Sequence, residues 1–430
     1  VGVTGCRLQV TGYGGKRAPA TACNLHLVTC NQRLISQEKE SPVDDRPPPL
    51  MVSEPGSFAE FTVTHRMPRI IDDVLAGTAY PSDIVANLTR LRDALPDGPV
   101  AAPRPHLPDA AFWQGARAPW EGATWHELPW FLAETYFYRL ILEATCYLEA
   151  GPWEGVDPFA PQKRAALAEG LAELDAFVVA LPAAADRRER FALWFHRALW
   201  GNRADLSNVA VSGGTFEAAA RAGLLIDHTA EAWSMLSRGI DRVDVVADNA
   251  GPELLVDLGL VAFLLSEGLA RQVRLHLKPT PFFVSDATIP DWRETLAALE
   301  GSARPALPDV AARLRRAEAD GRLALHDHPF WTRSLFFSQL PLDLRADLAK
   351  ADLLILKGDL NYRRLLEDRH WPPTTDLAAV TRFMPAPFVA LRTLKSEIMV
   401  GLPPGRAEAL SVEDPHWLIN GERGVIHLVR

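Results

Sequence analysis

A buried strand that ends in Asp248-Asn249 is the feature that most constrains the fold of this chain. The segment 243–251, VDVVADNAG, opens with valines around one aspartate, a pattern typical of a short strand inside a sheet. Gly251-Pro252 then begins the next element, and proline suits the first turn of a helix because it lacks the N–H that would be unpaired there. Side chains just beyond the carboxyl end of such a strand face a crevice, at which the following helix directs its amino end. The pattern therefore predicts a functional site here, although Asp-Asn beside glycine is also typical of an ordinary turn.

The composition restricts the class of protein. The chain has 430 residues, of which 48% are hydrophobic and 23% charged, enough for two domains or one large one. A net charge of -9 argues against a nucleic-acid or anionic-membrane partner. The most hydrophobic run, 254–265, contains Asp257 and is too short to span a bilayer, and no signal peptide is readable at the start. We therefore expect a cytoplasmic protein with no nucleic-acid or membrane partner.

Three regions differ in their sequence pattern. Residues 1–50 lack a clear period and end in three prolines, which predicts a disordered leader or an incorrectly assigned start, with the folded chain beginning near Met51. Residues 51–198 repeat apolar side chains at helical spacing. From residue 199 to 430, short β-branched runs alternate with helical segments. We predict an α/β protein in which a helical amino-terminal domain packs on a three-layer α/β, Rossmann-like domain.

Aromatic residues are concentrated in one helical segment of the first region. We interpret this set as core packing in preference to a ligand box. Its members are Trp130, Phe131, Tyr136, Phe137 and Tyr138. Glu134 and Arg139 lie among them, and we expect these two to make buried polar contacts and to take no part in catalysis.

Polar clusters follow five of the six strands that we predict. The strands are expected at 243–247, 274–277, 323–326, 353–356, 388–391 and 425–429. The clusters are Asp248-Asn249, Asp286, His326-Asp327-His328, the KGDLNYR segment 357–363 and the RTLK segment 392–395. Each cluster alone is compatible with a solvated loop, but five strand ends together indicate one site.

The chemistry of these clusters is that of a metal and phosphate site. Asp248, Asn249 and Asp286 offer the oxygen ligands that a hard divalent ion prefers. Arg363 and Lys395 would neutralise phosphate oxygens, and phosphoryl transfer needs little besides positioning and charge neutralisation. The sequence contains no G-x-S-x-G, P-loop, H-E-x-x-H or G-x-G-x-x-G motif.

Seven segments resemble the damage-control phosphatase family, in its acidic-residue methyltransferase 1-like branch, also called domain of unknown function 89. They are GSFAEFTV, LWGNRADLS, ADNAGPEL, PFFVSDATIPDW, LKGDLNYRRL, DRHW and LRTLKSEI. The resemblance covers nearly everything after Met51, and the combination of RTLK with DNAG and GDLNYR is specific. It implies a helical domain on an α/β domain, in agreement with the fold expected from the residues.

The resemblance also implies roles for individual residues. As metal ligands it implies Asp248, Asn249 and Asp286. As substrate-binding residues it implies Asp248, Asn249, Asp359, Leu360, Asn361, Tyr362, Arg363 and Lys395. As supporting residues we add Asn202, Asp205 and Arg392.

The activity that the resemblance implies is hydrolysis of sugar phosphate monoesters such as fructose 1-phosphate and fructose 6-phosphate, in metabolite damage control, with Mn²⁺, Ni²⁺, Co²⁺ or Mg²⁺. We expect Asp248, Asp359 and Lys395 to be catalytic, with Asp248 or Asp359 acting either as a nucleophile or as the base for a metal-bound water. The alternative is an S-adenosylmethionine-dependent protein-glutamate O-methyltransferase, although we find no S-adenosylmethionine loop. A silent binding module is a third possibility, against which the intact acidic residues count.

Overall fold

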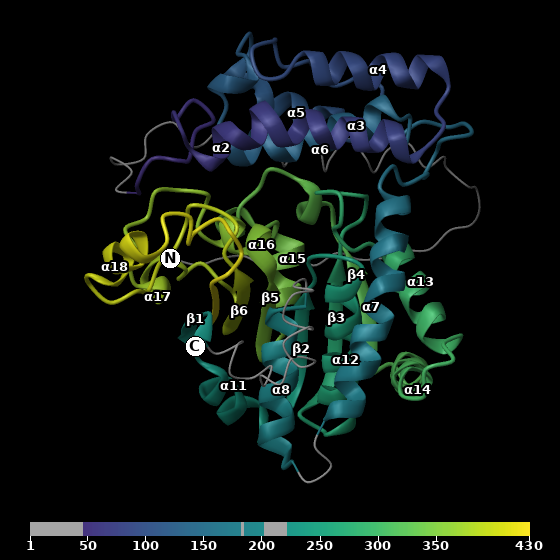
Figure 1. Ribbon diagram of the computed structural model, residues 1–430, viewed down its shortest axis with the longest axis vertical. Coiled ribbons are helices and arrows are strands. Elements are labelled where there is room, and N and C mark those ends of the chain that lie inside the picture. Colours follow the sequence, from purple (N-terminus) through teal and green to yellow (C-terminus); the bar gives the residue numbers. More distant parts are fainter. Residues whose placement is uncertain (1–45, 182–184, 202–221) are drawn as a thin grey trace, which may run out of the picture. The chain divides into compact units, whose positions relative to one another are not determined.

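The computed structural model describes residues 46–181, 185–201 and 222–430 of the chain (Figure 1). Pro47–Arg430 forms one unit by its contacts, and the fold described below is that of this unit. Its contacts begin at residue 47, before the predicted start at Met51: the Leu50 N–H donates to the Asp368 carbonyl over 2.8 Å.

A sheet of seven strands forms the centre of the described unit, in the order β1-β7-β6-β5-β2-β3-β4. The strands are β1 (Leu224–Asp227), β2 (Ile240–Val246), β3 (Ala270–Leu277), β4 (Leu323–Asp327), β5 (Leu353–Lys357), β6 (Phe388–Thr393) and β7 (Gly424–Val429). Strands β2 to β6 pair in parallel, whereas β7 pairs antiparallel to β6 and parallel to β1. All five residues of β5 and all six of β6 are buried, as parallel strands covered on both faces require.

Helices cover both faces of the sheet. Alternate residues of β5 join different cores: Leu353 and Ile355 pack in one, Leu354 and Leu356 in the other. The first core includes the helices α7 (Ala160–Ala180), α8 (Arg187–Leu199), α11 (Thr229–Leu236), α12 (Pro252–Ser266), α13 (Ile289–Glu300) and α14 (Leu307–Ala319). The second includes α15 (Leu342–Leu348), α16 (Gly358–Leu365), α17 (Leu377–Val380) and α18 (Arg406–Glu413), with the 3-10 turns η4 (Pro329–Thr332) and η5 (Phe337–Gln339). The predicted three-layer α/β fold is confirmed.

A helical layer lies at the top of Figure 1, beyond the carboxyl ends of the strands. It contains α2 (Phe58–Phe61), the π-helical turn η1 (Thr62–Arg66), α3 (Met67–Gly77), α4 (Ser82–Asp93), α5 (Ala110–Arg117), the 3-10 turns η2 (Ala118–Trp120) and η3 (Trp125–Glu127), and α6 (Trp130–Ala144). Every residue of α6 is buried, which confirms that its aromatic set is core. Glu134 and Arg139 make the buried polar contacts expected of them, with Arg363 and with Asp109 and Glu143 respectively.

Three features differ from the sequence predictions. A helix was expected over 252–271, but α12 ends at Ser266 because Gly268 turns the chain with φ +62° and β3 begins at Ala270. Strand β1 was not predicted: it has four residues, and an apolar run of three, Leu-Leu-Ile, is too short for its pattern to indicate a strand. Helices α7 and α8 lie within the predicted helical domain in sequence, yet they pack on the sheet through α12.

The strand order has a switch point between β2 and β5. The chain passes from β2 to β3 and β4 on one side of β2, then returns to the other side to form β5. Helices that follow β2 and β5 therefore leave in different directions, and ligands of open α/β sheets bind at this kind of switch point. The residues after β2 and after β5 are Asp248-Asn249 and Gly358-Asp359.

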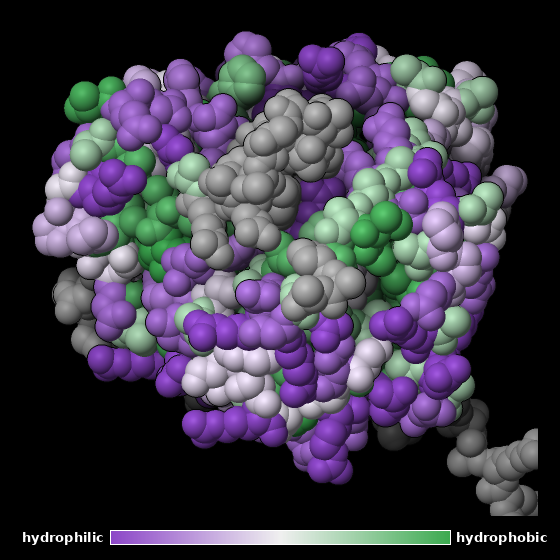
Figure 2. All heavy atoms as spheres, turned by 60° about the horizontal axis from the view of Figure 1, so that its bottom comes forward, coloured by the Kyte–Doolittle hydropathy of each residue, from purple (hydrophilic) through white to green (hydrophobic). Residues whose placement is uncertain are grey.

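The opposite end of the molecule comes forward in Figure 2. On that face hydrophilic residues predominate, with smaller hydrophobic areas between them. Such a mixture is ordinary for a folded surface. Among the helices that the structure describes, none combines the length and apolar character needed to cross a bilayer.

Candidate active site

Strand register brings side chains from four strand ends to one edge of the sheet. Val246 pairs with His276 of β3 and with Leu356 of β5, which in turn pairs with Ala390 of β6. Two residues further along the sequence from these four paired residues lie Asp248, Lys278, Gly358 and Arg392. The structure thus joins the predicted strand ends after β2, β5 and β6.

Asp248 and Asp286 are brought together by backbone contacts between their loops. Asn249 and Asp286 form an isolated antiparallel bridge, in which the Ala287 N–H donates to the Asp248 carbonyl over 2.8 Å. Both carboxylates are buried, with 7% of Asp248 and 1% of Asp286 exposed. The structure therefore places the two predicted acidic metal ligands side by side inside the protein.

The side chain of Asn249 is held by three partners. Its Nδ2 donates to Asp248 Oδ2 and to Glu253 Oε2, both over 2.9 Å. Its Oδ1 accepts from Ser285 Oγ over 2.6 Å. Because the carboxylate oxygens of Asp248 and Glu253 can only accept hydrogen bonds, the amide nitrogen of Asn249 must face them, and the amide oxygen faces Ser285.

Two lysines supply positive charge beside these acids. Lys278 Nζ donates to the Ala247 carbonyl over 2.8 Å and lies 3.3 Å from Asp286 Oδ2. Lys395 is exposed, and among the described residues its ammonium has no hydrogen-bond or ion-pair partner. Burial raises the pKa of Asp248 well above its usual range, Glu253 and Asp286 add to the rise, and Lys278 and Lys395 oppose it. Burial likewise raises the pKa of Asp286, against the opposing effect of Lys278.

The oxygens of this cluster fit a hard divalent cation. Asp248 Oδ1 and Asn361 Oδ1 are buried and accept no hydrogen bond from the described residues, and such groups need an ion or water as a partner. Asp286 Oδ2 accepts no hydrogen bond either, but it lies 3.3 Å from the Lys278 ammonium. Among the described residues, no three or more His, Cys, Asp or Glu side chains are grouped so that they could hold a metal ion. The predicted ligand set has only two such residues, because its third member is an asparagine.

Gly358 allows β5 to approach Asp248 closely. Its φ is +80°, and a Cβ at this position would lie 1.9 Å from Asp248 Oδ2. No other residue type fits, because any side chain would displace the Asp248 carboxylate.

Asp359 is held differently from Asp248. Its Oδ1 accepts from Arg392 Nε over 2.6 Å, from the Lys395 N–H over 3.2 Å and from Ser396 Oγ over 3.1 Å. Burial acts to raise the pKa of Asp359, but Arg392 and Arg363 outweigh it and the pKa is lowered. This carboxylate therefore anchors the RTLK loop, and Arg392 has the supporting position predicted for it.

The rest of the predicted substrate-binding segment is largely internal. Leu360 packs in the core, and Tyr362 lies under the Arg392 guanidinium at 4.2 Å from its ring centroid. Asn361 Nδ2 donates to the Lys357 carbonyl over 2.7 Å, which leaves its Oδ1 on the side of the amide away from that bond. Asn361 Oδ1 and Tyr362 Oη are both buried and have no hydrogen-bond partner among the described residues.

Arg363 is occupied by carboxylates of the protein itself. Its Nε and Nη2 donate to the two oxygens of Asp368 over 2.7 and 2.9 Å, and its Nη1 donates to Glu134 of α6. Its guanidinium also lies 3.6 Å from the ring centroid of Trp130. The structure does not direct this guanidinium at the acidic cluster, and a phosphate contact of Arg363 stays a prediction.

Sequence reasoning missed several contributors. Lys278 directly follows β3, so its strand-end position was a usable signal, and Ser285 adjoins the predicted Asp286. Glu253 and Lys357 lie within the motifs quoted, but nothing in the sequence shows that they form an ion pair of 3.0 Å. Asn202 and Asp205 lie outside the residues that the structure describes.

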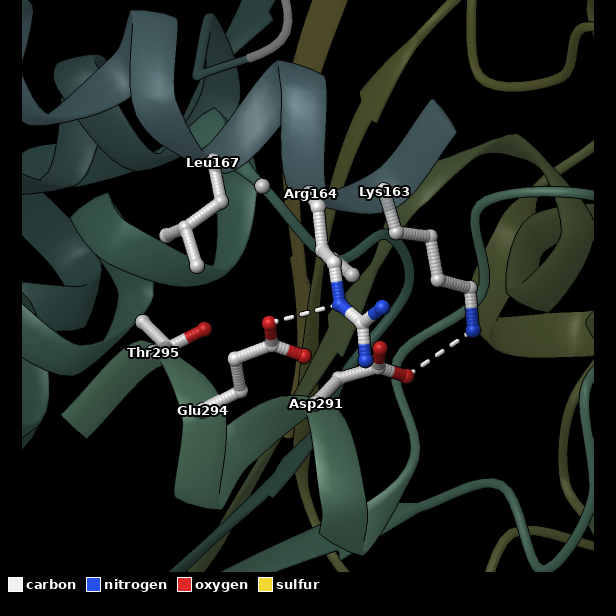
Figure 3. A pocket seen from close by; sticks show the side chains of 8 residues that line it. Lys163, Arg164, Leu167, Asp291, Glu294 and Thr295 are labelled. Atoms are coloured by element: carbon white, nitrogen blue, oxygen red, sulfur yellow. Dashed lines mark hydrogen bonds and ion pairs between the residues drawn. The ribbon is translucent and has the colours of Figure 1, made fainter. Parts of the chain in front are cut away.

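A small cavity lies behind the Ala250-Gly251 turn (Figure 3). Its volume is about 10 Å³, which is room for about one water molecule and too little for a substrate. Lys163 of α7 reaches Asp291 of α13 over 2.8 Å, and Arg164 reaches Glu294 over 2.8 Å. These pairs brace α7 against α13 and are not part of the acidic cluster.

Comparisons with known proteins identify the family of this chain. Residues 43–410 match the family model of the damage-control phosphatase ARMT1-like domain. Relatives named damage-control phosphatase ARMT1 are 33% identical in Danio rerio, 32% in Mus musculus and 31% in Homo sapiens. Each alignment covers 88% of this chain, and 96%, 97% and 98% of the respective relative. A crystal structure of a DUF89 family protein from Pyrococcus horikoshii is 16% identical with a TM-score of 0.44, covering 84% of this chain and 95% of that one. The chain belongs to the family of proteins with a damage-control phosphatase ARMT1-like domain.

Proposed function

We propose that this chain is a metal-dependent phosphatase that hydrolyses sugar phosphate monoesters, of the fructose 1-phosphate and fructose 6-phosphate type, in metabolite damage control. Its membership of a damage-control phosphatase family supports a phosphatase that acts in metabolite repair. The observation that carries the proposal is the pair of buried carboxylates, Asp248 and Asp286. Asp248 Oδ1 has no hydrogen-bond partner among the described residues, and Asp286 Oδ2 faces the Lys278 ammonium at 3.3 Å.

The proposed cofactor is a divalent ion, Mn²⁺, Co²⁺, Ni²⁺ or Mg²⁺. Asp248, Asp286 and Asn249 would hold it, since the Asn249 Oδ1 has a second lone pair besides the one used by Ser285. When bound, such an ion supplies Lewis-acid polarisation of a phosphate oxygen.

The protein's own charges would bind the phosphate. Lys395 is exposed beside the acidic cluster, close enough to lower the pKa of Asp248, so its ammonium is free to neutralise a phosphate oxygen. Helix α16 begins directly after β5, and α12 begins at Pro252, after the loop that follows β2. Their amino ends add a positive potential at the same edge. The buried Lys278 ammonium compensates the negative charge of the buried Asp286 carboxylate.

Asp248 is better placed than Asp359 to act on the reacting phosphate. Its Oδ1 is unused among the described residues and its raised pKa suits a group that takes up a proton. Asp359 already accepts three hydrogen bonds at Oδ1 and has a lowered pKa, which suits an anchor. We propose Asp248 as nucleophile or base, and trapping a phospho-enzyme at Asp248 would identify the nucleophilic route.

The test is phosphate release from a panel of sugar phosphates with each metal or with EDTA. Wild type is compared with Asp248→Asn and with the matched control Asp257→Asn, which removes an equally buried carboxylate outside the cluster. We expect release that needs metal, is lost in Asp248→Asn and persists in Asp257→Asn. Absence of release with every sugar phosphate and metal would contradict the proposal. Binding of S-adenosylmethionine without metal would favour the methyltransferase instead.

A further inference from the structure

A buried polar chain runs from the acidic cluster into the core behind it. Asn249 Nδ2 donates to Glu253 Oε2 over 2.9 Å, and Glu253 Oε1 lies 3.0 Å from Lys357 Nζ. Lys357 Nζ also lies 2.8 Å from an oxygen of Asp257, one helical turn beyond Glu253 in α12. The side chains of Glu253, Asp257 and Lys357 are 7%, 2% and 1% exposed.

Lys357 holds Glu253 in one position. The lysine ammonium donates to Glu253 over 3.0 Å and to the Ala198 carbonyl over 2.5 Å, and it forms an ion pair with Asp257. A buried carboxylate needs such a cation, because removing charge from water without a partner is costly. One oxygen of Glu253 is thereby fixed on Lys357, which leaves the other facing Asn249.

The fixed carboxylate determines which way the Asn249 amide points. Both N–H groups of the amide are used, one by Glu253 and one by Asp248, so turning the amide over would set its oxygen against two carboxylates. The carbonyl oxygen therefore points toward Ser285, in the loop that carries Asp286. Without Glu253, one of the two interactions that enforce this orientation is lost.

We propose that Glu253, held by Lys357, is a positioning residue that keeps the Asn249 carbonyl oxygen toward Ser285 and the loop of the predicted metal ligand Asp286, and so sets the affinity for a divalent metal. This inference rests on the proposed metal-dependent function. Residues that orient a metal ligand through a hydrogen bond typically change metal affinity by about 10- to 100-fold when they are replaced.

Asp257 provides a matched control for Glu253. Both are acids of α12 and both pair with Lys357, but Glu253 alone contacts Asn249. Glu253→Gln and Asp257→Asn therefore remove the same kind of charge from the same lysine. A difference between the two variants isolates the contact with the asparagine.

The experiment is calorimetric titration of the full chain with Mn²⁺ alone, together with thermal unfolding of each metal-free variant. We expect Glu253→Gln to bind Mn²⁺ about 10- to 100-fold more weakly than wild type, and Asp257→Asn to bind it as wild type does. We also expect kcat of Glu253→Gln to recover at saturating Mn²⁺, because the residue acts through metal affinity. A purely structural role would lower the unfolding temperature of both variants without separating their Mn²⁺ affinities.

Two results would overturn the inference: unchanged Mn²⁺ affinity in folded Glu253→Gln, or equal losses in both variants. If Glu253→Gln does not fold, Glu253→Asp keeps the charge for Lys357 but withdraws the oxygen from Asn249, and it must weaken Mn²⁺ binding. If wild type and the two variants show the expected differences in Mn²⁺ affinity but wild type releases no phosphate, the positioning role stands and the proposed phosphatase activity is contradicted. Should wild type bind no Mn²⁺, both fail.

Discussion

Two buried ionic clusters lie at the carboxyl ends of the strands, and they differ in how their charges are used. In the acidic cluster, Asp248, Asp286 and Lys278, the lysine pairs with Asp286, and Asp248 Oδ1 has no hydrogen-bond partner among the described residues. In the arginine cluster, Arg363 donates to both oxygens of Asp368 and to Glu134. The first is arranged to receive a ligand, whereas the second ties the helical layer to the α/β layers.

The difference shows that a strand-end position does not by itself make a residue part of a site. Arg363 belongs to the segment that the sequence predicts to bind substrate, and it follows β5 as Asp248 follows β2. Its donors are nevertheless committed to the protein's own carboxylates, while Lys395, which has no such partner among the described residues, keeps its charge for a ligand. Four predictions test this contrast.

The largest effect is expected from Arg363→Met. The substitution leaves Glu134 and Asp368 buried without their cation, so the free energy of unfolding in urea should fall by about 3–5 kcal/mol. Arg164→Met is the control: its partner Glu294 is half exposed, and the loss should stay below about 1 kcal/mol. A stable Arg363→Met protein with a raised KM for sugar phosphate would instead make Arg363 a substrate ligand.

Gly358→Ala should disable the acidic cluster. The new methyl would meet Asp248 Oδ2, and displacing that carboxylate by about 1 Å should cost about 100-fold in kcat/KM for phosphate release. Gly321→Ala is matched to it, with φ +71° but nothing within 4 Å of the added Cβ. The control should show backbone strain and full activity. Equal activities of the two variants would refute the close approach at Asp248.

Lys395→Ala should lower the catalytic efficiency of phosphate release without changing the stability of the fold. Losing one hydrogen bond to a charged phosphate, worth about 1.5 kcal/mol, should lower kcat/KM roughly 10-fold. The urea midpoint should be unchanged, because the side chain is exposed. Lys350→Ala, another exposed lysine, which lies beside Asp347, should leave kinetics unaltered. A Lys395→Ala protein with wild-type kcat/KM would remove this lysine from the site.

The fourth prediction concerns stability and pH. Burial raises the pKa of Asp257 to about 7, with Lys357 opposing and Glu253 adding. Between its ordinary value of 3.8 and about 7, the folded chain keeps a proton that the unfolded chain has lost. Stability should therefore fall as pH rises through this window, by at most about 1.4 kcal/mol per pH unit, and the loss is complete above it. Urea unfolding at several pH values should show this slope in wild type and a shallower one in Asp257→Asn. Identical slopes would contradict the assignment.

The sequence predicts the fold because buried parallel strands have a strong local signal. Runs such as 353–356 contain only Leu and Ile, and β5 was found there, whereas the run of the edge strand β1, 224–226, is only three residues long and was not assigned to a strand. The convergence of Asp248, Asp286 and Gly358 depends on the order of the strands in the sheet. The sequence predicts the strands but not their order. The partners of Arg363 and Lys357 were not predictable, since Glu134 lies 229 residues from Arg363 and Glu253 lies 104 from Lys357. No local pattern encodes a contact over that distance.

The most direct test of the contrast is Mn²⁺ binding, measured by electron paramagnetic resonance, in one variant of each cluster. Asp248→Asn removes a charge from the acidic cluster, and Glu134→Gln removes one from the arginine cluster while Asp368 still pairs with Arg363. We predict that wild type and Glu134→Gln bind Mn²⁺ and that Asp248→Asn does not. Mn²⁺ binding that survives in Asp248→Asn would contradict the assignment of the acidic cluster as the metal site.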